Sequence, residues 1–340
     1  MRHRWIDIAR GICILCVVLS HSPYEPTLYR CIFEPFFLTT FFFLSGVVFN
    51  YKSIGKSLFN CSTKILWPYF VNSIIVALAS TKWIGLIMHG DISAVAEYFQ
   101  ELGYKIITGK VFWFLACLFI VQLLAILIIH LFNSKKKYIF YIAAICLSMI
   151  TAISGKEPTI WNSNTAIFAL GYFLLGYVCQ EMVLSYELLR HKRLVGFITL
   201  TLYISIIVLI YITRPQPLSY DMHNNELSPE LPYLLLSFIG IFTICTIGKS
   251  IHQCSILEII GTHSLVIYMY HGYGLALSKH LYEVLCIDTF SNYQYCYSLL
   301  FSFTATLITL VFAIFINRYC PIIIGRGCTI NNLYNKLFRQ

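Results

Sequence analysis

Residues 112–132 read FWFLACLFIVQLLAILIIHLF, an apolar run that contains no Asp, Glu, Lys or Arg. An α-helix rises ~1.5 Å per residue and the hydrocarbon core of a bilayer is ~30 Å thick, so about 20 such residues cross it. The run therefore predicts a membrane-spanning helix, and we expect the chain to fold in a bilayer.

Runs of similar length and character recur along the whole chain. They are residues 5–22, 32–49, 65–81, 112–132, 138–154, 165–184, 194–212, 232–249, 258–278 and 296–317. None of them alternates apolar and polar residues with the period of two that a membrane β-barrel needs. We therefore predict an all-α fold, a polytopic transmembrane helical bundle of about ten spans, forming one integral-membrane domain over residues 1–340.

The composition agrees with a membrane protein. Of the 340 residues, 58% are apolar and 11% are charged, and the mean hydropathy is +0.74. Soluble domains average ~45–50% apolar and ~25% charged residues. Intrinsic disorder is excluded because disordered chains are poor in apolar and aromatic residues, and a disulfide-stapled scaffold because such chains are short.

The placement of the basic residues predicts the orientation. With the N-terminus in the cytoplasm, the inner segments hold Arg2, Arg4, Lys52, Lys56, Lys64, Lys135, Lys136, Lys137, Arg190, Lys192, Arg193, Lys249, Arg318, Arg326, Lys336 and Arg339. The outer segments hold only Arg30, Lys82, Lys105, Lys110, Lys156, Arg214 and Lys279. Because cytoplasmic loops carry the excess of Lys and Arg, both termini are predicted to be cytoplasmic. The basic residues form no stripe interleaved with aromatics, so nucleic acid is not an expected partner.

Two predicted loops differ from the others in length or in proline content. The outer segment 82–111 is long enough to contain an amphipathic helix that lies on the membrane surface. The segment 213–231 is interrupted by several prolines, so we expect irregular structure there.

Ionisable residues inside a span are costly, so they indicate functional sites, and the first span contains Asp7, Arg10 and His21. His21 lies eleven positions after Arg10, a rise of roughly 16 Å and about three whole turns, so both side chains share one face of a helix. Asp7 lies three residues before Arg10 and can pair with it. The alternative is that Arg10 anchors the helix at the lipid headgroups and His21 caps it at the opposite interface.

His21 is the residue type whose ordinary pKa suits proton transfer near neutral pH, and Glu34 begins the second span at the same level, where it could orient the imidazole. Glu34 could equally be an exposed loop acid. The sequence has no H-E-x-x-H or Cys/His ligand spacing, so we expect no metal site. The pair Cys13 and Cys16 lies on an apolar helix and is expected to serve packing.

A second polar cluster lies near the ninth span: Glu258, Gly261, His263, Ser264, Tyr268 and His271. Small residues at Gly261 and Ser264 favour close helix approach. His271 is either a participant in the chemistry or a hydrogen-bonded packing residue.

Five short segments follow one another in the order that is typical of one protein family. They are the R-x10-H spacing of Arg10 and His21, residues 41–46 (FFFLSG), 66–69 (LWPY), 111–115 (VFWFL) and 260–271 (IGTHSLVIYMYH). In this order the chain resembles the acyltransferase family 3 membrane proteins. It departs from many members at residues 37–40 (FLTT), where those have His-Met-Pro before the FFFLSG segment.

The resemblance implies an O-acyltransferase that moves an acetyl or other short acyl group from cytoplasmic acetyl-CoA to a hydroxyl of a cell-surface glycan or lipid-linked sugar. It makes His21 and Arg10 the essential pair, with acetyl-CoA as a co-substrate and no bound cofactor. The family's distribution implies a bacterial inner membrane.

A mechanism follows from this resemblance as a hypothesis. Arg10 and the basic inner segments would hold acyl-CoA, while His21 would act as general base or acyl carrier. Trp113 and Tyr268 would line the acceptor pocket, or else belong to the interfacial aromatic belt. The competing hypotheses are a transporter or flippase that uses Arg10 and His21 for gating or proton relay, and a catalytically silent membrane scaffold.

Overall fold

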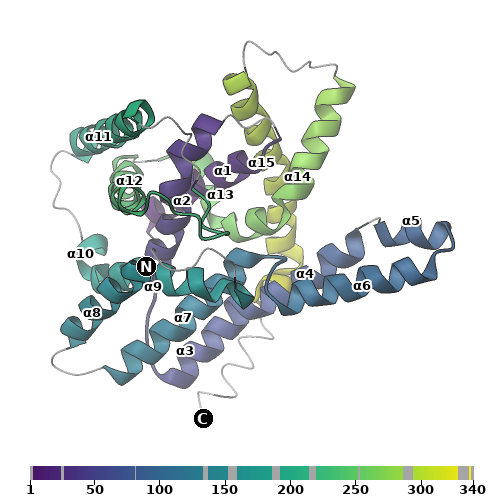
Figure 1. Ribbon diagram of the computed structural model, residues 1–340, viewed down its shortest axis with the longest axis horizontal. Coiled ribbons are helices and arrows are strands. Elements are labelled where there is room, and N and C mark those ends of the chain that lie inside the picture. Colours follow the sequence, from purple (N-terminus) through teal and green to yellow (C-terminus); the bar gives the residue numbers. More distant parts are fainter. Residues whose placement is uncertain are drawn as a thin grey trace.

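A computed structural model describes residues 3–23, 27–80, 82–132, 137–151, 159–185, 192–213, 220–251, 253–285, 294–327 and 337. Within these ranges the regular structure is helical, apart from one isolated antiparallel bridge between Asp221 and Glu226 (Figure 1). The all-α prediction is confirmed for the described part of the chain.

Several of the described helices are long and apolar enough to cross a membrane. Six such segments occur: α2 (Thr27–Val47), the run Ile54–Met88, α7 (Trp113–Leu131), α11 (Lys192–Thr213), α12 (Glu230–Ser250) and α15 (Gln294–Tyr319). The run Ile54–Met88 contains α3 (Ile54–Cys61), the π-helix η1 (Ser62–Leu66), α4 (Trp67–Ala79) and α5 (Lys82–Met88). The multi-pass helical bundle is confirmed at this level.

The other predicted spans correspond to helices that are shorter or more polar. They are α1 (Arg4–Ser20), α8 (Lys137–Ile150), α9 (Ser163–Val178) and α14 (Ser264–Val284). Most residues of α1 and α9 are buried by other helices, so these two lie inside the bundle rather than at its rim. The total of ten spans and the cytoplasmic position of both termini stay predictions.

The predicted single span 258–278 is corrected by the structure. The helix breaks at His263 into α13 (Ser255–Thr262) and α14, and α13 packs along α1. A Cβ atom at Gly261 would meet the Asp7 carbonyl oxygen and lie 2.8 Å from the Gly11 nitrogen. The break therefore lets α13 approach α1 backbone to backbone, which the uninterrupted apolar pattern did not reveal.

Two other predicted boundaries also shift. The segment 165–184 is divided between α9 and the short α10 (Gln180–Leu184), with a turn at Cys179. The helix expected from residue 65 already begins at Ile54, where the Ser53 hydroxyl accepts a hydrogen bond from the Lys56 N–H (3.4 Å).

The structure describes parts of both predicted loops, and the position of segment 82–111 on the membrane surface stays a prediction. Segment 82–111 forms α5 and α6 (Ile92–Ile107), a hairpin that projects from the rest of the bundle (Figure 1). Asp91 caps α6 by accepting the Ala94 N–H at 2.9 Å. Residues 220–229 are irregular, while residues 214–217 with their two prolines lie outside the described residues.

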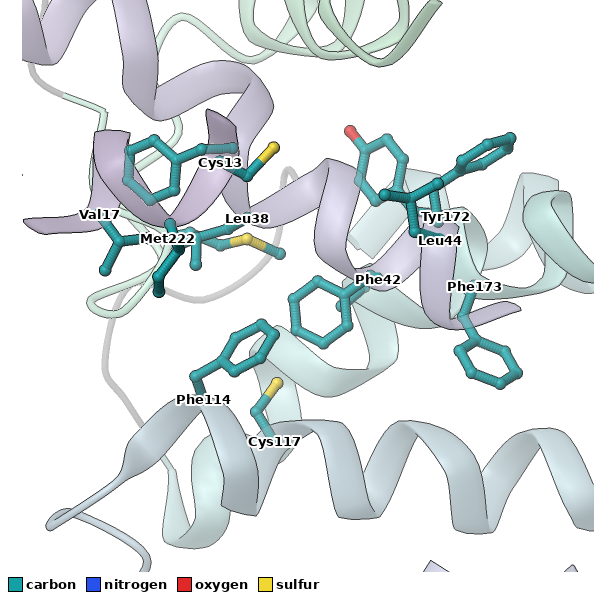
Figure 2. Close-up of a cluster of buried hydrophobic side chains, with 14 of the residues drawn as sticks. Cys13, Val17, Leu38, Phe42, Leu44, Phe114, Cys117, Tyr172, Phe173 and Met222 are labelled. Carbon is teal, nitrogen blue, oxygen red and sulfur yellow. The ribbon is translucent and has the colours of Figure 1, made fainter. Parts of the chain in front are cut away.

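The buried core connects α1, α2, α7 and α9. Figure 2 shows Phe114 of α7 turned toward Phe42 of α2, and their ring centroids lie 5.0 Å apart. Met222, from the irregular segment, belongs to the same buried cluster as Val17 and Leu38. One end of α1 is therefore packed against a loop as well as against helices.

Candidate active site

One face of α1 lines a small internal cavity. Arg10, Ile14 and Val17 follow each other along this face and contribute to a cavity of about 130 Å³. His21 is the next residue in the same helical register and stands at the C-terminal end of α1. The spacing of Arg10 and His21 thus places them at the two ends of one stripe, as the sequence predicts.

The other walls of the cavity are mainly apolar. They consist of Leu38, Phe41 and Ser45 from α2, Phe114, Leu115 and Leu118 from α7, and Ser264, Leu265 and Tyr268 from α14. Few polar groups enter an otherwise apolar space, which is typical of sites that bind small organic groups.

His21 meets a second histidine. Its ring lies 4.9 Å from that of His271, centroid to centroid, with an angle of 34° between the planes. The Nδ1 atom of His271 lies 2.7 Å from the Tyr268 carbonyl oxygen. Because a carbonyl oxygen only accepts, Nδ1 carries the hydrogen, and in the neutral ring Nε2 is left as an acceptor. The two histidines predicted from different parts of the sequence therefore form one pair.

Arg10 lies among charges of both signs. Asp7, buried one turn earlier on α1, attracts the guanidinium, and Arg326, near the far end of the chain, repels it. The proximity of Asp7 to Arg10 agrees with their spacing on one helix. Arg10 is half-buried, so its charge is available to a group inside the cavity.

Tyr268 lies between the two ends of the stripe. Its hydroxyl oxygen accepts the backbone N–H of Phe114 at 3.1 Å, one of the amide groups at the start of α7. Its ring lines the cavity and lies 6.3 Å from the ring of His271. Tyr268 therefore fixes α7 against α14 and also shapes the cavity.

Trp113 is placed beside the cavity rather than in its wall. Its ring packs on His223, with 4.9 Å between centroids and an angle of 49°. The partner of Trp113 is thus a residue from the irregular segment that the sequence left without a role.

Glu34 has a basic partner on its own helix. It forms an ion pair with Arg30, one turn earlier on α2, at 3.9 Å. The carboxylate whose charge acts on His21 is that of Asp221. The structure thus places a different acid near the imidazole.

Asp221 holds a tight turn that presents His223. Its Oδ1 atom accepts the N–H groups of His223 (2.8 Å) and Asn224 (3.2 Å), and its Oδ2 atom accepts from Asn224 Nδ2 at 2.7 Å. Asn162 Nδ2 donates to the His223 carbonyl oxygen at 2.8 Å, which ties the turn to the beginning of α9. Sequence reasoning missed both residues, although Asp-Met-His-Asn-Asn is a pattern in which a carboxylate commonly organises a turn.

Burial lowers the pKa of His223, which lies outside the membrane-spanning helices, and the charge of Asp221 partly opposes this effect. The ring against Trp113 is therefore neutral at physiological pH. The neutral His223 ring and the Trp113 ring together provide an uncharged aromatic surface.

Among the described residues, no group of three or more His, Cys, Asp or Glu side chains is arranged to hold a metal ion. Cys13 and Cys16 are buried free thiols in α1.

Comparison with known protein families gives one match. The family model described as an acyltransferase domain, that of acyltransferase family 3, matches residues 3–319. Neither the comparison with curated proteins nor the comparison with solved structures found a match.

Proposed function

The chain belongs to acyltransferase family 3, and we propose that it transfers an acetyl or other short acyl group from acyl-CoA to a hydroxyl of a cell-surface glycan or lipid-linked sugar. The observation that carries this proposal is the stripe on α1, where a cavity begins at Arg10 and ends one helical turn before His21. Such a space would lead from a cation for the donor toward an imidazole for the acceptor.

The size of the cavity supports a short acyl group. A volume of about 130 Å³ is small beside the ~300–1,000 Å³ of pockets that bind drug-sized ligands. Its apolar walls suit a thioester and its methyl group, while Arg10 can donate hydrogen bonds to the carbonyl or to an anionic part of the donor.

His21 acts in this proposal as the general base. It takes the proton from the acceptor hydroxyl while the acceptor oxygen bonds to the thioester carbon, the C–S bond breaks, and the thiolate leaving group receives that proton. His271 positions His21 through the ring contact and through its own bond to Tyr268. A variant of the same mechanism forms an acyl-His21 intermediate first and transfers the acyl group to the acceptor in a second step.

The acceptor would bind near Trp113 and His223, because flat rings suit the faces of sugar rings and this pair lies at the His21 end of the cavity. With both termini in the cytoplasm, Arg10 would face the cytoplasmic donor and His21 the outer side of a bacterial inner membrane. The excess of basic residues in the predicted inner segments supports this orientation.

The test uses inverted membrane vesicles that contain the wild-type protein and receive acetyl-CoA labelled in the acetyl group. We expect label in a glycan or lipid fraction with wild type and none above background with His21→Ala. His130→Ala is the matched control, because His130 bonds to the Tyr51 hydroxyl (2.9 Å) and does not line the cavity. Equal labelling with His21→Ala would refute the catalytic role, and vesicle uptake of the sugar without labelling would favour the transporter.

A further inference from the structure

Two basic residues that are distant in the sequence come together at the Arg10 end of α1. Lys64 belongs to the π-helix η1, and Arg326 follows the short 3-10 helix η5 (Pro321–Ile324) after α15. The charge of Arg326 acts on both Lys64 and Arg10, and that of Lys52 acts on Lys64. Positive charges from several elements thus converge beside the cavity.

The segment that carries Arg326 is fixed to α4. Trp67 Nε1 donates to the Ile322 carbonyl oxygen at 2.8 Å, and Asn72 Nδ2 donates to that of Ile323 at 3.1 Å. Asn72 is buried, and its Oδ1 atom accepts the Tyr270 hydroxyl at 2.6 Å. These bonds hold the end of η5 against the same helical run that contains Lys64.

Gly325 brings the next residue close to Lys64. It has a φ of +70°, a left-handed conformation that favours glycine. A Cβ atom there would meet the Thr63 carbonyl oxygen and would lie 3.3 Å from the Lys64 Cα atom. Arg326 therefore follows a residue that touches the backbone of Lys64, and its position depends on this glycine.

The side chain of Arg326 keeps most of its donors available. Its Nη1 atom donates to Asn317 Oδ1 of α15 at 3.2 Å, one of the five N–H groups of a guanidinium. Arg326 and Lys64 are both exposed. Among the described residues, neither has a carboxylate within 4.0 Å.

Like charges repel, and among the described residues no acid lies within 4.0 Å of either side chain to offset the repulsion, so binding of an anion between them would be favourable. Lys64 also lies in a π-helical turn, a local widening of the helix that occurs frequently at functional sites. A phosphate group suits the pair, since guanidinium binds two oxygens at once and the lysine ammonium adds a flexible point charge.

We propose that Lys64 and Arg326 form a phosphate-binding subsite that holds the phosphates of the acyl donor while its acyl end enters the cavity past Arg10. This inference rests on the proposed function, because it assigns the phosphates to a nucleotide-bearing acyl thioester. The phosphate of an anionic lipid headgroup has the same chemistry, so the experiment separates the two sources.

The experiment uses the full-length protein in nanodiscs of zwitterionic lipid, and the anionic lipid that each purified variant retains from the membrane is quantified before reconstitution. Binding of acetyl-CoA, S-acetyl-pantetheine and inorganic pyrophosphate is measured by calorimetry for wild type, Lys64→Gln and Arg326→Gln. S-acetyl-pantetheine carries the same thioester arm without any phosphate. Lys82→Gln is the matched control, because it removes one exposed positive charge from α5, in a predicted outer segment. Thermal unfolding of each variant verifies that it folds like wild type.

We expect each variant to bind acetyl-CoA and pyrophosphate about tenfold more weakly, since each loses charged hydrogen bonds. Binding of S-acetyl-pantetheine should be unchanged, and Lys82→Gln should bind all three ligands like wild type. Arg326→Lys should fall between wild type and Arg326→Gln, because it keeps the charge and loses the planar fork.

Three results would overturn the inference. They are unchanged acetyl-CoA affinity in both variants, an equal loss for S-acetyl-pantetheine, and a difference from wild type confined to the retention of anionic lipid. Acetyl transfer by wild type is measured in parallel. If pyrophosphate binding depends on Lys64 and Arg326 but wild type transfers no acetyl group, the phosphate subsite is supported and the proposed function is refuted. If wild type transfers acetyl groups but the variants bind acetyl-CoA like wild type, the proposed function is supported and the phosphate subsite is refuted.

Discussion

The imidazole rings of His21 and His271 lie 4.9 Å apart, and each stands one helical turn beyond a residue that lines the cavity, Val17 on α1 and Tyr268 on α14. The first helix of the chain and a late one thus meet through two groups of the same chemistry. Because His271 is hydrogen-bonded to its own helix, it is the fixed member of the pair, and the exposed His21 is the one that a substrate can reach.

The pair predicts unequal effects of substitution. We expect His21→Ala to abolish acetyl transfer and His271→Ala to lower kcat by about 100-fold, a loss typical for a group that assists proton transfer. His271→Asn, which can still donate to the Tyr268 carbonyl, should recover part of this loss. Initial rates of label transfer measure both effects. Full activity of His271→Ala would show that the ring contact has no part in the reaction.

Cavity size predicts acyl selectivity. Leu118→Ala should enlarge the cavity and raise the rate with butyryl-CoA relative to acetyl-CoA by about tenfold. One methylene in a hydrophobic pocket changes the discrimination between two substrates by roughly 10–200-fold. Leu131→Ala, at the exposed end of the same helix, is the control. An unaltered ratio of the two rates in Leu118→Ala would mean that the acyl chain binds elsewhere.

Helix packing predicts a contrast between two glycines. Gly261→Ala places a methyl group against the backbone of α1 and should reduce the free energy of unfolding by about 1–3 kcal/mol. Gly272→Ala meets nothing within 4 Å in α14 and should be neutral or stabilise by up to ~1 kcal/mol, because alanine is the better helix former. Denaturation in detergent compares them. Equal stabilities would refute the close approach of α13 to α1.

The environment of His223 predicts a dependence of stability on pH. Its pKa is lowered, mainly by burial, so the folded state binds the proton less readily than the unfolded state. The stabilisation from neutral His223 is present above the ordinary histidine pKa of about 6.5 and is lost as the pH falls below it.

The corresponding measurement is thermal unfolding at pH 7.5 and pH 5.5. Wild type should lose more stability between these two values than His223→Gln, whose side chain does not titrate. His89→Gln, at an exposed position after α5, should behave like wild type. A loss in His223→Gln as large as that of wild type would contradict the assignment.

Helical periodicity explains what was predictable. The positions of Arg10, His21 and Asp7 on one face of α1 follow from 3.6 residues per turn alone, and the structure agrees. The pairing of His21 with His271 needed tertiary structure, because nothing in either segment specifies which helices are neighbours.

The remaining differences have local causes. The apolar pattern continues through His263, so it did not predict the break that places α13 on α1. The pairing of Glu34 with Arg30 follows from their i,i+4 spacing on α2, whereas the proximity of Asp221 to His21 depends on how a distant loop packs against α1. The sequence around Asp221 predicts a turn, but it does not predict where that turn packs in the folded protein.

The juxtaposition of α1 with the turn after α15 has a consequence for biosynthesis. Translation delivers Arg10 first, whereas Arg326, whose charge acts on it, emerges only after α15 has been made. Until α14 and α15 have been made, α1 therefore stays in the translocon or bilayer without the cavity wall that α14 supplies and without the charge of Arg326. In the proposed mechanism, a partly synthesised chain contains the imidazole and the arginine but an incomplete cavity, so acyl transfer would begin only when the last helices have docked onto the first.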